Sequence, residues 1–178
     1  MTAHGELPVI DTVLLLMFPL AMAFAAANDL FTMKIPNKIS LALIAGFAVT
    51  ALYIQLPLEK AGMHLAIGAA VLVAGFVMFS MRLLGGGDAK LMAAGALWMG
   101  PDHALMYIAY VTIFGGLLSG AILAYRKFVP VSDAVLPEWA VKLHVQGTGI
   151  PYGLAIAASG LVMYPSTTWY QTLAGALL

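Results

Sequence analysis

The sequence predicts an all-α, polytopic membrane protein, a bundle of six transmembrane helices with its N-terminus outside. Three observations lead to this fold class: an apolar composition, long runs without charge, and a one-sided distribution of lysine and arginine. Of the 178 residues, 62% are hydrophobic and only 9% are charged, and the mean hydropathy is +0.97. A soluble domain carries about 25% charged residues. The chain is therefore expected to lie in a bilayer as a single domain, residues 1–178.

The composition also excludes several classes of protein. The formal net charge is zero, so the chain has no basic field for nucleic acid. It contains no cysteine, which excludes disulfide scaffolds, thiolate metal sites and a cysteine nucleophile. Membrane β-strands alternate apolar and polar residues over about 10 positions, whereas the apolar runs here are longer and apolar on every side. The spans are therefore predicted to be helices.

Gaps between charged residues mark the spans. A helix of about 20 apolar residues crosses the hydrocarbon core, which is about 30 Å thick. The fourth run ends at Pro101 and is short, which suggests a water-accessible notch at its inner end. Trp98 and Trp169 are expected at the outer interface as belt residues. The predicted spans are residues 12–28, 39–58, 61–81, 88–100, 104–125 and 150–164, with 166–178 continuing the last span or lying at the interface.

Lysine and arginine set the orientation, because they concentrate in cytoplasmic loops. Seven of the eight fall on one set of loops, and only Lys60 falls on the other. Both termini are therefore expected outside. The seven inner residues are Lys34, Lys38, Arg82, Lys90, Arg126, Lys127 and Lys142.

Two aspartates stand out against this topology. Asp29 ends the first apolar run and Asp88 opens the fourth. The first span runs inward and the fourth outward, so both carboxylates are expected at the same inner depth. Ionisable groups within a span are costly and usually line a cavity or a reaction site. The alternative is that Asp29 is a helix-end residue in water and Asp88 an N-cap.

Two neighbouring carboxylates can hydrolyse a peptide bond without a metal, cofactor or covalent nucleophile. Like charges cannot both ionise cheaply, so the pair shares one proton. The ionised member takes a proton from water, and the protonated member donates to the carbonyl oxygen. The glycines of the run 85–87 permit close backbone approach, so an extended substrate can lie beside Asp88. The four histidines are scattered without the spacing of metal ligands.

These residues resemble the two signatures of the type IV prepilin peptidases, which are membrane aspartic proteases of the Gly-x-Gly-Asp group. Gly85-Gly86-Gly87-Asp88 is followed by Ala89-Lys90-Leu91, and Asp29 is followed after five residues by Ile35-Pro36-Asn37. The segment Gly149-Ile150-Pro151-Tyr152-Gly153 is similar to the last-helix segment of that family.

The resemblance implies that Asp29 and Asp88 are the catalytic acids. It implies cleavage of the short basic leader of prepilins or pseudopilins at the cytoplasmic face of the bacterial inner membrane, just before the hydrophobic helix of the pilin. The small size is similar to that of the forms serving Flp-type tight-adherence pili. Larger relatives carry a cysteine-bearing insert and also N-methylate the product. This chain has no such insert and no cysteine, so methylation is not carried over.

Other residues are candidates for shaping the site. The glycines 85–87 are the first of these. Lys90 could stabilise a charged Asp88, or it could anchor the chain at the membrane interface. Asn37 could N-cap the second helix. On the long loop 126–149, Asp133 and Glu138 could attract a basic leader.

Three alternatives stay open. The first is a presenilin-type intramembrane protease, although that family has tyrosine where Asn28 precedes Asp29. The second is a proton-coupled transporter that uses the two aspartates as relay groups. The third is a pilus-assembly subunit without catalytic activity, which would need neither aspartate.

Overall fold

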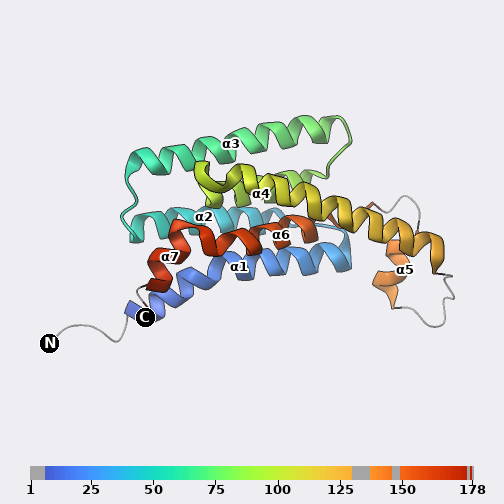
Figure 1. Ribbon diagram of the computed structural model, residues 1–178, viewed down its shortest axis with the longest axis horizontal. Coiled ribbons are helices and arrows are strands. Elements are labelled where there is room, and N and C mark those ends of the chain that lie inside the picture. The colour runs from blue at the N-terminus through green and yellow to red at the C-terminus, as the bar shows by residue number, and fades with distance from the viewer. Residues whose placement is uncertain (1–6, 130–136, 146–148, 176, 178) are drawn as a thin grey trace.

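The computed structural model describes residues 7–129, 137–145, 149–175 and 177, and all regular structure in these ranges is helical. Figure 1 shows the long helices side by side along one common direction. The elements are α1 (Leu7–Thr32), α2 (Asn37–Tyr53), α3 (Leu58–Ser80), α4 (Gly86–Phe128), α5 (Glu138–His144), α6 (Tyr152–Met163), the 3-10 turn η1 (Tyr164–Ser166) and α7 (Thr168–Gly175).

Helix α4 is two arms that fold back on each other at Gly100. This residue has φ 64° and ψ −171°, a conformation that is essentially confined to glycine, and Pro101 follows it. Because of the reversal, a side chain added at Gly95 in the first arm would collide with the hydroxyl of Tyr107 in the second. Figure 1 shows the second arm (residues 101–128) running back past the start of α4, with α5 packed against its far end.

In the described part of the chain, the segments α1, α2, α3, the two arms of α4 and α6 follow in the predicted order, and each runs opposite to the one before it (Figure 1). Among the described residues, three helices are long and apolar enough to cross a membrane, Val9–Thr32, Leu58–Ser80 and the two-armed Gly86–Phe128, while Asn37–Tyr53 is a shorter apolar helix. The sixth segment, α6, has 12 residues and is followed by η1 and α7. Each helix bound lies within five residues of the predicted one. The largest differences are at the start of the first helix, Leu7 rather than residue 12, and at the end of the second, Tyr53 rather than residue 58.

Helices α2 and α3 end in left-handed turns formed by residues other than glycine. Gln55 has φ 54° and Arg82 has φ 60°. The next N–H in each case bonds back to the helix, from Leu56 to the Ala51 carbonyl at 2.8 Å and from Leu83 to the Met78 carbonyl at 2.9 Å. These bonds satisfy carbonyls that a helix end leaves free. They fix where the chain leaves each helix and so set up the turn into the next.

The prediction that Trp98 and Trp169 are interfacial belt residues is wrong. Both side chains are fully buried, with ring centroids 5.7 Å apart, at the end of the bundle where α4 reverses. Each indole N–H is satisfied inside the protein. Trp98 donates to the Leu43 carbonyl at 2.9 Å and Trp169 to the Trp98 carbonyl at 2.7 Å. Aromatic rings from α1, α2 and η1 surround Trp98, and rings from α2 and α3 surround Trp169, so both indoles belong to the core.

Candidate active site

Asp29 lies in the last turns of α1 and is buried, with 6% of its surface exposed. Its Oδ2 accepts a hydrogen bond of 2.8 Å from the backbone N–H of Gly153, the second residue of α6. The alternative of a helix-end residue in water is therefore wrong for Asp29. A buried carboxylate held by a backbone donor from a distant helix has a defined position, which a reaction site requires.

Asp88 is the third residue of α4, whereas the N-cap of that helix is Gly85. The alternative that Asp88 is an N-cap residue is therefore wrong. Its half-buried carboxylate turns back over Gly85, where an added side chain would collide with it. Asp88 also lies close enough to Asp29 for the two carboxyl groups to interact electrostatically.

Both aspartates line one cavity of about 520 Å³ at the end of the bundle opposite the Gly100 turn. Three parts of the chain enclose it: the end of α1, the loop that leads into α2, and the glycine-rich start of α4. The lining residues are Asp29, Met33, Lys34, Ile35, Pro36, Asn37, Gly85, Gly86, Gly87 and Asp88.

Glycine permits the close packing around this cavity at two positions. A Cβ at Gly153 would lie 2.8 Å from Ile35 Cδ1 and 2.9 Å from Asp29 Oδ2. At Gly87 it would lie 3.1 Å from Ile35 Cβ. Ile35 is therefore wedged between the starts of α4 and α6. Asn28 supports the loop that carries it, because its Nδ2 donates to the Lys34 carbonyl at 2.6 Å.

A second cavity, of about 650 Å³, borders Asp88 from another side. Its walls come from the end of α3, the second arm of α4 and the start of α6. Asp88 thus stands between two open spaces, and an extended chain passing over its carboxylate could occupy both. The polar and charged residues that share this cavity with Asp88 are Arg82, Ser119 and Tyr152.

Lys90 and Asn37 contact each other rather than the aspartates. The Lys90 ammonium donates to Asn37 Oδ1 at 2.9 Å, which joins α4 to α2. The predicted N-cap role of Asn37 is wrong, since Pro36 occupies that position and Asn37 is the first residue of α2. Because its oxygen is held by Lys90, the Asn37 side chain has a fixed orientation at the edge of the aspartate cavity.

The remaining candidates contribute less to this site. Glu138 is exposed and begins α5, a short helix within the stretch that the sequence predicted as a loop. Asp133 lies outside the described residues. Within the described ranges, no three histidine, aspartate or glutamate side chains come together in a group that could hold a metal ion.

Comparison with known protein families agrees with this arrangement. The sequence profile of the type IV leader peptidase family matches residues 16–124, more than half of the chain and a range that includes both aspartates. The chain belongs to the type IV leader peptidase family. Membership implies peptidase activity, and together with the three long apolar helices it indicates a membrane protease. No curated protein and no solved structure matches the chain significantly.

The sequence analysis assigns no role to two residues that shape this candidate site. Gly153 holds Asp29 through its N–H, and Ile35 packs against both Gly87 and Gly153. A sequence pattern does point to Gly153, because Pro151 followed by Gly153 is typical of a helix start that can approach another backbone closely. No local pattern indicates that this particular N–H faces α1, since the contact joins residues 124 positions apart.

Proposed function

We propose that this chain is a membrane aspartic endopeptidase that removes the short basic leader of Flp-like prepilins or pseudopilins at the cytoplasmic face of the inner membrane. A water molecule between Asp29 and Asp88 attacks the scissile carbonyl. One carboxylate takes the proton of the water, and the other, protonated, donates to the carbonyl oxygen. The carboxyl group that took the proton of the water then returns it to the leaving nitrogen, while the other carboxylate takes a proton from a hydroxyl of the gem-diol. The C–N bond breaks, the leader keeps the new carboxyl group and the pilin keeps the new amine, and no cofactor takes part.

The observation that carries this proposal is the shared cavity of the two aspartates. Asp29 and Asp88 come from helices that are far apart in sequence and meet at one open space. Two interacting carboxyl groups share a proton, which supplies the acid and the base together. A merely structural role would not require both acids to face a cavity of this size.

The glycines and the neighbouring polar residues have supporting roles in the proposal. Gly85, Gly86 and Gly87 offer bare backbone beside Asp88, along which an extended leader can lie. Lys90 acts through Asn37, whose amide it orients at the cavity edge. We assign neither Asn37 nor Lys90 to the chemical step.

The decisive experiment mixes purified protein with a prepilin that carries an intact leader. Wild type is expected to yield the shortened pilin. Asp29→Asn and Asp88→Asn each remove one carboxylate at nearly unchanged volume, and each is expected to lower the rate at least about a hundredfold. The matched control is Asp102→Asn, because Asp102 is exposed and follows the Gly100 turn at the opposite end of the bundle.

Three results would contradict the proposal. If either aspartate variant processes the prepilin like wild type, the acids are not the catalytic pair. If Asp102→Asn is equally inactive, the loss is not specific to the site. If wild type leaves the prepilin intact and instead conducts protons in vesicles in an Asp29-dependent way, the transporter alternative is correct.

A further inference from the structure

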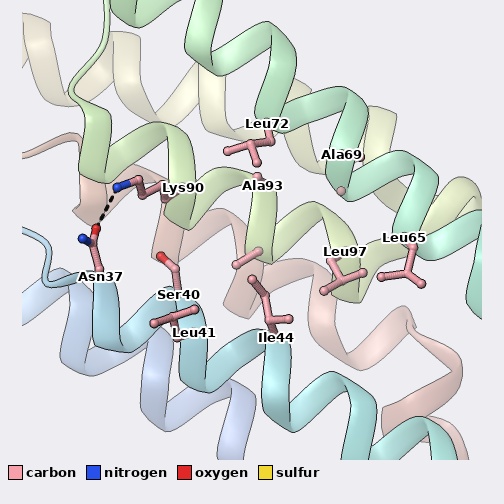
Figure 2. Close-up of a pocket in the computed structure, with 12 residues that line it drawn as sticks. Asn37, Ser40, Leu41, Ile44, Leu65, Ala69, Leu72, Lys90, Ala93 and Leu97 are labelled. Carbon is pink, nitrogen blue, oxygen red and sulfur yellow. Dashed lines mark hydrogen bonds between the residues drawn. The ribbon is translucent and has the colours of Figure 1, made fainter.

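An apolar groove between α2 and α3 begins beside the aspartate cavity. Both helices pack on α4, and the space between them has a volume of about 500 Å³. Figure 2 shows its residues along the three helices, with Asn37 and Lys90 together at one end. Asn37 lines both this α2–α3 groove and the aspartate cavity. The two spaces are therefore neighbours.

The walls and floor of the α2–α3 groove differ in side-chain size. Its walls are large apolar side chains exposed on the protein surface, including Leu41 and Ile44 of α2 and Leu72 of α3. Its floor on α4 includes the buried Ala93 and Ala94. Small residues at a helix surface allow another helix to approach closely within a membrane.

The α2–α3 groove also contains a polar group without a partner. Ser40 has only 6% of its surface exposed, and its hydroxyl has no hydrogen-bond partner. The hydroxyl points from α2 toward α4, between Asn37 and the middle of the groove (Figure 2). The Ser40 oxygen itself is covered by neighbouring atoms, whereas the exposed Asn37 amide opens onto the same end of the groove. A ligand that offers a peptide N–H or C=O at this end is therefore favoured over a plain hydrocarbon chain.

The size of the groove identifies the shape of the ligand. From Asn37 to Ile44 the groove follows α2 for about 10 Å, at about 1.5 Å per residue. A whole helix, which is about 10 Å wide, fills more than the available volume over that length. The row of side chains along one ridge of a helix fits between two neighbouring helices. The groove thus matches one face of an apolar helix.

We infer that the α2–α3 groove seats the apolar helix of the substrate, immediately after the cleaved bond. This inference rests on the proposed function, in which cleavage occurs just before a hydrophobic helix. A substrate helix that starts at the aspartate cavity passes the exposed Asn37 amide with its first turn, where free N–H groups need acceptors. It then runs along α2 away from the acids, and the groove selects substrates by the side chains on the C-terminal side of the cleaved bond.

Cross-linking tests this placement directly, because the chain has no cysteine of its own. Ala69 lines the groove, whereas its neighbour Ala70 is exposed but is not among the lining residues. In the Asp29→Asn background, Ala69→Cys is expected to cross-link to a prepilin with single cysteines in the first turns of its apolar helix. The yield should exceed that of Ala70→Cys at least about tenfold, because only position 69 faces the docked helix.

A kinetic comparison of Ala69→Phe with Ala70→Phe gives a second, independent readout. A phenylalanine at position 69 is expected to raise KM for the prepilin about tenfold and to leave kcat within about twofold. The reason is that it removes contacts that the substrate makes equally in the ground state and in the transition state. Ala70→Phe is expected to match wild type. A large fall in kcat for Ala69→Phe would indicate structural damage and overturn the inference.

The possible failures are distinguishable. If Asp29→Asn and Asp88→Asn abolish processing while the two phenylalanine variants behave alike and neither cysteine variant cross-links, the groove inference fails and the peptidase function stands. A groove occupied by a lipid acyl chain or by a second copy of the chain would give that result. If Asp29→Asn processes prepilin normally, the proposed function itself fails.

Discussion

At the scale of single residues, the position of Asp29 depends on a glycine in another helix. Gly153 donates its backbone N–H to Asp29 and leaves no room for a side chain, since an added Cβ would lie 2.9 Å from Oδ2 and 2.8 Å from Ile35 Cδ1. Gly153→Ala should therefore push α6 and the carboxylate apart. We expect leader cleavage to fall at least about tenfold, because displacements near 1 Å at a catalytic group cost up to about a hundredfold.

The control for this prediction is Gly120→Ala, on the second arm of α4. A Cβ at Gly120 meets no atom within 4 Å, and alanine favours a helix over glycine by up to about 1 kcal/mol. Processing assays on both variants, with thermal unfolding of each in detergent, separate an effect on the site from loss of fold. Equal activity of the two variants would refute the role assigned to Gly153.

The sequence predicts that the two aspartates share one place in the fold, which they do, but it does not predict all of the contacts around them. Asp29 and Asp88 could be paired because charge-free runs placed the end of one helix and the start of another at the same depth. The contact of Lys90 with Asn37 could not be foreseen, because the two residues are 53 positions apart and either could have faced the aspartates. Side-chain direction on a helix depends on packing that local patterns do not specify.

At the scale of elements, the turn at Gly100 brings the second arm of α4 back along the bundle. Gly100 has φ 64° and ψ −171°, and an added side chain would meet the ring of His64. The His64 ring is fixed in place, because its Nδ1 lies 2.7 Å from the Leu97 carbonyl. Gly100→Ala therefore meets both backbone strain and a collision, and we expect it to destabilise the protein by about 1–3 kcal/mol.

Thermal unfolding in detergent measures this effect, with Gly116→Ala as the control. Gly116 lies on the same helix, and a Cβ there meets nothing within 4 Å. The double variant Gly100→Ala with His64→Ala is expected to recover only part of the loss, because it removes the collision and leaves the backbone strain. Unfolding of Gly100→Ala at the same temperature as Gly116→Ala would show that the turn tolerates a side chain.

Most element boundaries can be located from charges and prolines, and the exceptions have physical causes. Pro101 marks the end of the first arm of α4, as predicted, but no local pattern shows that α1, α2 and α7 enclose Trp98 there. Arg82 and Gln55 end their helices in left-handed turns, which are usually recognised in a sequence by glycine. The second span is predicted to run to residue 58 because the next charge is Glu59, whereas the helix ends at Tyr53, just before this capping turn.

At the scale of the whole molecule, the arrangement predicts which side of the membrane the site faces. Asp102 follows the Gly100 turn and Lys127 lies near the far end of the second arm, so about 25 residues, or about 38 Å of helix, separate them. That length exceeds the hydrocarbon core of about 30 Å. The aspartate cavity lies at the Lys127 end, and most lysine and arginine residues belong to that end, so it should be cytoplasmic.

Because the chain contains no cysteine, single variants report this orientation without interference. Asp102 and Lys127 are both exposed. In intact cells with a permeabilised outer membrane, a charged maleimide that cannot cross the inner membrane should label Asp102→Cys and spare Lys127→Cys. Labelling of Lys127→Cys should appear only after the inner membrane is opened. The reverse labelling pattern would place both aspartates on the outer side of the membrane. A leader that stays in the cytoplasm cannot reach them there. The proposed substrate would then be wrong even if the two acids hydrolyse peptides.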